Sequence, residues 1–260
     1  MLKILKYSFY DLIRSRWSYV YLAFYLLLGI VLLFLNNDLS KAVITLMNVI
    51  IVLVPLIGTI FGVMYYYNSK EFTELLLAQP LDRSSIFLGQ YLGVALSLTM
   101  SLILGLGIPF VVYGLFKSNA IWDFSLLLIT GAFLTFIFTA LAFNIAVSNE
   151  NKIKGFGYAI LLWLFLAVIY DGLFLLSLIV FEDYPLDKLS LVGSMLNPID
   201  LSRTLILLKL DISALLGYTG AVFKNFFGTN FGLVVSFAVL ILWVLLPVFR
   251  LVRKSNKKDF

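Results

Sequence analysis

The chain has 260 residues, of which 62% are hydrophobic and 13% are charged. Soluble domains carry about 25% charged residues, so this chain does not have enough polar surface to cover a water-soluble globule. Much of its apolar surface must face lipid instead. The composition therefore excludes an ordinary soluble protein and indicates an integral membrane protein.

Cysteine and histidine are both absent from the sequence. This excludes disulfides, thiol nucleophiles, imidazole general bases, and metal sites built from thiolate or imidazole. The sequence also has no Gly-rich phosphate loop, no H-E-x-x-H pair and no G-x-S-x-G motif. We therefore expect no catalytic residues, no bound cofactor or metal, and no ATP hydrolysis by this chain.

Six apolar stretches are long enough to cross a hydrocarbon core of about 30 Å, which takes roughly 20 helical residues. They lie near 17–35, 43–66, 86–116, 124–147, 155–181 and 231–251. The third and fifth exceed the minimum length, so we expect tilting, kinking or extension past the lipid there. No repeat or Pro-rich linker divides the chain, which predicts a single all-α domain over 1–260 with six transmembrane helices.

Lysine and arginine are distributed unequally between the two sides that six spans define. The side of both termini holds 13 of the 19 basic residues, namely Lys3, Lys6, Arg14, Arg16, Lys70, Arg83, Lys152, Lys154, Arg250, Arg253, Lys254, Lys257 and Lys258. The positive-inside rule then places both termini in the cytoplasm. The charges are spread over four short segments and form no continuous groove, which argues against nucleic-acid binding.

The first 16 residues show an amphipathic pattern. Leu2, Leu5, Phe9 and Leu12 recur at helical spacing, with the basic residues off that line. This pattern predicts an interfacial helix over 1–16. A cleavable signal peptide is the alternative. The absence of a small-x-small cleavage site after the apolar stretch argues against it.

The segment 205–223 is apolar enough to be considered as a seventh span. Lys209 and Asp211 lie within it, and each would cost about 3 kcal/mol at the middle of the bilayer. A seventh span would also place the basic C-terminal tail outside. We therefore expect 182–230 to be an outward, periplasmic loop whose helices lie at or dip into the outer interface.

Asp171 is the ionisable residue inside the predicted fifth span. It must find a partner, line a polar cavity or be protonated. One interpretation is a role in coupling or gating, and the other is structural pairing with a neighbouring helix. A proton-coupled secondary transporter with Asp171 as proton carrier is a further alternative. The sequence shows no internal repeat, which argues against this class.

Gly89 and Gly93 form a G-x-x-x-G spacing on the third span. Missing side chains at this spacing let another helix approach closely. The partner helix could belong to the same chain or to a second copy.

The segment 68–83 joins the second and third spans. It begins with capping and acidic residues and is interrupted at Pro80, which predicts a short amphipathic helix over 70–80 on the cytoplasmic side. Without further information, a surface connector at the headgroups would be the simpler interpretation.

This segment resembles the permease subunits of ABC-2-type transporters. In that family a cytoplasmic helix of the pattern T-L-E-L-L-L-x-x-P-x-x-R-x-x-I-x-x-G-K follows span two and docks on the ATPase. The positions that match in register are Glu74, Leu75, Leu76, Leu77, Pro80, Arg83, Ile86 and Gly89. Phe72 and Thr73 replace the usual T-L, and Gln90 replaces the usual Lys.

The resemblance has several implications. The N-terminal interfacial helix, six spans and long last outward loop are also features of this family, so the resemblance covers the whole chain. It implies two copies of this chain and two copies of a separate ABC ATPase that binds ATP and Mg. The residues expected to contact the ATPase are Lys70, Glu71, Glu74, Leu75, Leu76, Leu77, Pro80 and Arg83.

A second segment, 196–203, resembles the L-N-P-T-D-x-x-R segment of one group within this family, with Ile199 in place of Thr. Asp171 also falls where that group carries an aspartate. The group works with a periplasmic β-helical protein in the maturation of the copper centres of nitrous oxide reductase. This implies that a periplasmic partner contacts Asn197, Pro198, Asp200 and Arg203.

Without histidine or cysteine, such a permease is expected to transmit motion and not copper. The alternative is one half of an exporter for a drug, lipid or polysaccharide.

Overall fold

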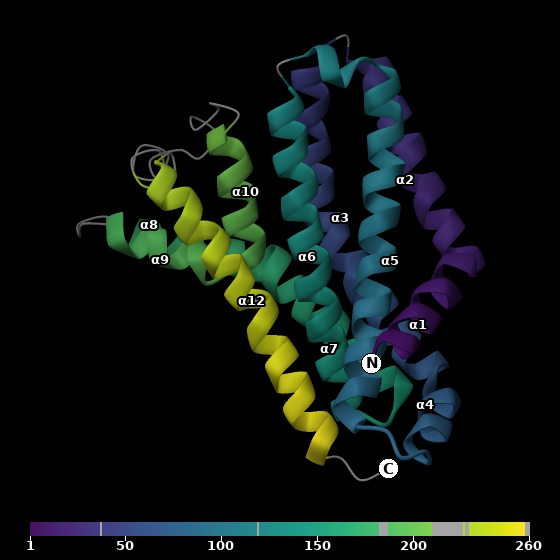
Figure 1. Ribbon diagram of the computed structural model, residues 1–260. Coiled ribbons are helices and arrows are strands. Elements are labelled where there is room, and N and C mark those ends of the chain that lie inside the picture. The colour runs from purple at the N-terminus through teal and green to yellow at the C-terminus, as the bar shows by residue number, and fades with distance from the viewer. Residues whose placement is uncertain (37, 119, 182–186, 210–225, 227–228, 258–260) are drawn as a thin grey trace.

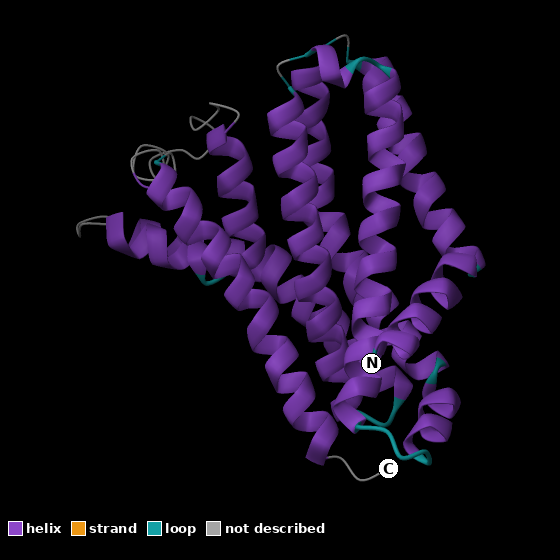
Figure 2. Ribbon diagram, in the orientation of Figure 1, coloured by secondary structure: helices purple, strands orange, loops and turns teal. Residues whose placement is uncertain are grey.

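The computed structural model describes residues 1–36, 38–118, 120–181, 187–209, 226 and 229–257. Every regular element in these ranges is helical (Figure 2). Six helices there are long and apolar enough to cross a membrane: Arg16–Leu35, Leu39–Asn68, Arg83–Val112, Ile121–Ser148, Lys152–Val180 and Phe231–Asn256. The prediction of six such helices is confirmed.

The elements follow one another along the chain (Figure 1). The first half holds α1 (Leu2–Arg14), α2 (Arg16–Leu35), α3 (Leu39–Asn68), α4 (Lys70–Leu77), α5 (Arg83–Val112), the short η1 (Leu115–Lys117) and α6 (Ile121–Ser148). The second half holds α7 (Lys152–Leu164), the π-helical turn η2 (Phe165–Ile169), α8 (Tyr170–Val180), α9 (Asp187–Met195), α10 (Pro198–Lys209) and α12 (Asn230–Lys257).

The centre of the bundle is formed by α3, α5 and α6. Half or more of the residues in the most apolar stretch of these three helices are buried, compared with 17% along α7–α8 and 22% in α12. Leu46, Leu98 and Phe138, one from each central helix, are fully buried. The apolar outer faces of α7–α8 and α12 are therefore available to lipid or to another protein.

One end of the bundle carries the N-terminus, α4, the start of α7 and the end of α12 (Figure 1). We call this end the termini side. Lys152 at the start of α7 donates a hydrogen bond to Asn68 at the end of α3, 3.1 Å away. The basic segments that the sequence placed on one side therefore gather at one end of the molecule.

Helix α1 lies at an angle against α5, and glycines make this contact possible. A Cβ atom added at Gly93 would lie 2.6 Å from Ser8 Cβ, and one added at Gly89 would lie 3.0 Å from Ile4 Cβ. The G-x-x-x-G spacing is thus used for packing within one chain. The buried residues of α1 are Ile4, Ser8 and Leu12, whereas Leu2 is 78% exposed.

The helix predicted over 1–16 is therefore present, but its buried face differs from the expected one. The glycines of α5 admit the small Ser8, so the contact centres on Ile4 and Ser8 and leaves Leu2 outside.

The fifth span bends at the π-helical turn. Figure 1 shows α8 lying crosswise to the long helices and extending away from the centre of the bundle, with α9 beside it. Tyr170 Oη donates to Gly193 O at 2.6 Å, which ties α8 to α9. A π-helical turn frees carbonyl groups for partners outside the helix, and Leu166 O accepts a hydrogen bond from Asn197 Nδ2 at 2.8 Å. The kinking expected for this long span is found here.

The loop predicted over 182–230 contains two described helices, α9 and α10. Helix α10 packs against α3, α6 and α12, with Ile199, Leu201 and Leu205 at most 1% exposed. It is thus part of the bundle, and its position at the outer interface stays a prediction. The rest of that loop, including most of the candidate seventh span 205–223, lies outside the described residues.

Candidate functional site

Helix α4 projects from the termini side, directly after the second span. Its register is set at Ser69, which separates α3 from α4 and whose Oγ donates to Tyr65 O at 2.8 Å. The backbone N–H of Thr73 donates to Ser69 O. The i→i−4 hydrogen bonds therefore continue through the junction, and α4 is fixed to the end of α3.

One face of α4 is anchored to two neighbouring helices. Gln90 of α5 donates from Nε2 to Thr73 Oγ1 at 2.8 Å, and both side chains are buried. The ring of Phe72 stacks on Tyr7 of α1 with the centroids 4.6 Å apart. Phe72, Thr73 and Gln90 are the positions that depart from the ABC-2 pattern, so two of these departures bond to each other.

The opposite face of α4 is open. Leu75 is 68% exposed, and Glu71 and Glu74 are exposed beside it. Lys70 and Glu74 form an ion pair at 3.8 Å with both side chains about half exposed, which contributes little to stability. On this face an exposed leucine is thus flanked by two acidic side chains.

The other residues that we predicted to contact the ATPase follow Leu75 along the chain. Leu76 and Leu77 are half-buried, and Pro80 and Arg83 are exposed where the chain turns from α4 into α5. The structure thus brings the predicted residues together at one end of the bundle. Their contact with an ATPase stays a prediction.

A second polar cluster joins the bent fifth span to α10. Arg203 Nη1 lies 2.8 Å from Asp171 Oδ2 and 3.4 Å from Asp200 Oδ1. Asn197 Nδ2 donates to Asp200 Oδ2 at 3.0 Å as well as to Leu166 O. The cluster therefore holds the bend between α7 and α8 in contact with the start of α10.

Two carboxylates share one guanidinium in this cluster. Asp200 is nearly buried, and its burial together with the nearby Asp171 carboxylate raises the pKa of Asp200 to about 6, against the opposing effects of Arg203 and Asn197. Asp171 pairs with Arg203 of the neighbouring helix α10, which is the structural pairing that the sequence offered as one of two interpretations. A role in coupling or gating stays a prediction.

The residues predicted to contact a periplasmic partner are largely turned inward. Asn197 and Pro198 are buried, and the amide of Asn197 caps the first turn of α10 by accepting from Ile199 N at 3.1 Å. A contact with a periplasmic protein stays a prediction. Within the described residues, no group of three or more His, Cys, Asp or Glu residues could hold a metal ion.

Sequence reasoning missed several residues that organise these sites. Gln90, Thr73 and Tyr7 hold α4, and the signal that could have revealed the first two is that they depart together from the ABC-2 pattern. Leu166 contributes only its carbonyl group to the second cluster. No side-chain pattern predicts that contribution, because it depends on the π-helical turn.

Six long apolar helices and an exposed helix after the second define a multi-pass α-helical membrane protein. No protein-family model matches the chain. Over 134 residues it is 28% identical to the probable ABC transporter permease protein NosY of Stutzerimonas stutzeri, covering 50% of this chain and 49% of that protein. Over 149 residues it is 28% identical to the NosY protein of Pseudomonas aeruginosa, covering 54% and 53%.

The chain therefore spans about half the length of the curated relatives it matches. The resemblance to ABC transporter permeases is confirmed as a distant and partial similarity to proteins of the NosY type.

Proposed function

We propose that this chain is the transmembrane permease subunit of an ABC transporter and works with a separate ATPase subunit. The observation that carries the proposal is the similarity to NosY permeases, together with an exposed helix α4 on the termini side. In this proposal the termini side faces the cytoplasm of a bacterial cell, as the excess of basic residues favours. ATP and Mg are bound by the partner, and this chain binds no cofactor.

The contacts of α4 suggest how ATP-driven motion enters the bundle. A partner that moves the exposed face at Leu75 also moves Thr73, which is bonded to Gln90 of the central helix α5. Phe72 carries the same displacement to α1 through its stacking on Tyr7. Packed helices transmit such displacements as rigid elements. The coupling in this proposal is mechanical.

The finer proposal is a NosY-like role in the copper-site maturation of nitrous oxide reductase. The complex would hold two copies of this chain, a NosF-like ATPase and a periplasmic, NosD-like β-helical protein. The segment 196–203 and the position of Asp171 support it. The cluster of Asp171, Asn197 and Arg203 would then couple the bend of the fifth span to the outward loop.

Co-purification tests the general proposal. The full chain is tagged, extracted from native membranes in mild detergent, and its partners are identified by mass spectrometry. We expect an ABC ATPase in near-stoichiometric amount, and we expect Leu75→Asp to lose it because a charge is placed in the centre of the docking face. Ile153→Asp is the matched control, because Ile153 is 82% exposed at the start of α7 on the same side.

A chain that carries no ATPase, or Leu75→Asp and Ile153→Asp complexes of equal composition, would rule the proposal out. A β-helical periplasmic protein in the same complex would support the finer proposal. An ATPase complex without it would favour the exporter.

A further inference from the structure

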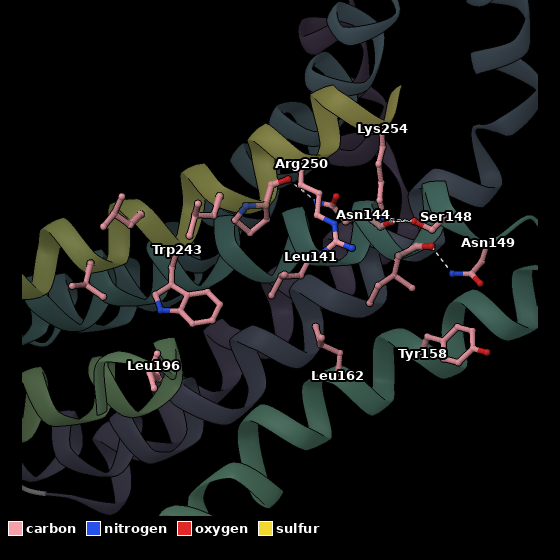
Figure 3. A pocket seen from close by; sticks show the side chains of 15 residues that line it. Leu141, Asn144, Ser148, Asn149, Tyr158, Leu162, Leu196, Trp243, Arg250 and Lys254 are labelled. Atoms are coloured by element: carbon pink, nitrogen blue, oxygen red, sulfur yellow. Dashed lines mark hydrogen bonds between the residues drawn. The ribbon is translucent and has the colours of Figure 1, made fainter. Parts of the chain in front are cut away.

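A groove of about 570 Å³ lies between α6, α7 and α12. Figure 3 shows its side chains converging from the three helices. The wall along most of its length is apolar and includes Leu141, Leu162, Leu242 and Leu246. Two of these helices, α7 and α12, are little covered by the rest of the bundle, so lipid can reach the groove from the side.

One end of the groove is cationic. Arg250 and Lys254 stand one turn apart on α12, on the termini side, and line the same groove. Lys254 Nζ donates to Ser148 Oγ and, at 3.4 Å, to Asn144 O. Like charges at this spacing repel each other. In the part of the chain that the structure describes, neither makes an ion pair with a carboxylate.

A polar atom in the same end also lacks a partner. Asn144 Nδ2 donates to Ala140 O at 2.8 Å and to Pro247 O at 2.7 Å, which fastens α12 to α6 at the floor of the groove. Its Oδ1 is buried and accepts no hydrogen bond within the described residues. Buried acceptors are nearly always satisfied. A ligand with a hydroxyl group would satisfy this one.

The length of the groove matches one leaflet. Its residues on α12 run from Val239 to Lys254. The 11 residue steps from Val239 to Arg250, the first cationic residue, rise about 16 Å. Half of a hydrocarbon core is about 15 Å thick. The groove is therefore apolar over the depth of one acyl chain and cationic where a headgroup would lie.

We propose that this groove binds an acidic phospholipid from the leaflet on the termini side. Its phosphate lies between Arg250 and Lys254, a headgroup hydroxyl donates to Asn144 Oδ1, and one acyl chain follows the leucines of α7 and α12. A zwitterionic lipid would leave the two positive charges less well compensated. The site goes beyond the proposed function and does not depend on an ATPase.

Native mass spectrometry of the purified full chain tests the chemistry. Phosphatidylglycerol and phosphatidylcholine with identical acyl chains are titrated as probes. We expect at least a tenfold preference for phosphatidylglycerol, lost in Arg250→Gln/Lys254→Gln. The control Arg253→Gln/Arg14→Gln removes the same charge, and Arg253 lies over the ring of Phe249, 5.8 Å from its centroid. We expect the control to keep the preference.

The position of the lipid is tested without changing either cation. Trp243 lines the groove, so phosphatidylglycerol brominated on its acyl chain should quench a fluorescence component that is present in the unaltered chain and missing from Trp243→Phe. Equal binding of the two lipids, a preference that persists in Arg250→Gln/Lys254→Gln, or no quenching of Trp243 would overturn the proposal. So would a disulfide between two Leu246→Cys chains, because a second copy would then cover the groove.

Discussion

Arg203 divides its guanidinium between the carboxylates of Asp171 and Asp200. The sequence indicated that Asp171 needs a partner, since an isolated charge in a span is costly. It did not indicate Arg203, which is 32 residues away. The pairing requires the π-helical turn and the placement of α10 in the bundle, and neither follows from local side-chain pattern.

Removing Arg203 should therefore destabilise the chain more than removing an exposed arginine. In Arg203→Ala the two carboxylates face each other without a cation, and we expect a loss of about 1–2 kcal/mol, since the pair is partly exposed. The double variant Arg203→Ala/Asp171→Asn should recover part of this loss. Thermal unfolding in detergent measures both, with Arg253→Ala as control. Strictly additive effects would show that the two groups are not coupled.

At the scale of elements, close helix contacts are set by small residues. The sequence indicated that Gly89 and Gly93 admit a helix but left its identity open. The structure assigns it to α1, because α1 has small or β-branched residues, Ser8 and Ile4, at the matching spacing. The helices themselves were predictable from hydropathy, whereas the side chains that lock them together depend on which faces meet.

Two glycines of α5 give a matched test of the α1 contact. An added methyl at Gly93 meets Ser8 Cβ at 2.6 Å, whereas one at Gly107 meets nothing within 4 Å. Alanine favours a helix over glycine by about 1 kcal/mol, so Gly107→Ala should be neutral or stabilising. Gly93→Ala should lower the unfolding temperature, because α1 must shift. Equal behaviour of the two variants would contradict the observed packing.

The hydrogen bond from Gln90 to Thr73 should keep α4 closed against α5. Its loss is worth about 1 kcal/mol, which corresponds to an about fivefold larger open population of α4. Limited trypsin digestion should therefore cleave after Lys70 about five times faster in Gln90→Leu. Gln79→Leu, at an exposed position after α4, is the control. Unchanged cleavage in Gln90→Leu would mean that other contacts hold α4.

At the scale of the whole molecule, most of what the sequence predicts about the fold comes from hydropathy and charge. Six spans and a gathering of basic segments at one end could be predicted, because lipid imposes both length and charge asymmetry. The sideways course of α8 and the burial of α10 could not be predicted, because apolar side chains are compatible both with contact to lipid and with packing against other helices. Hydropathy does not separate a helix that faces lipid from one that faces other helices.

The absence of cysteine makes the orientation directly measurable. Asn256→Cys reports on the termini side, and Lys117→Cys reports on the opposite end in η1, with both residues exposed. In spheroplasts, a membrane-impermeant maleimide should label Lys117→Cys and leave Asn256→Cys unlabelled until the membrane is opened. The reverse pattern would place α4 outside the cell, where ATP-driven coupling is not available.

Photo-cross-linking from α4 in the intact complex tests the central proposal most directly. A photoreactive amino acid is placed at Leu75 in the full chain, with Ile153 as the matched position on the same side. We expect a cross-link to an ABC ATPase from position 75 that changes in yield when ATP is bound, and none from position 153. A complex that contains the ATPase but gives no cross-link from position 75 would contradict the role of α4 as the coupling helix.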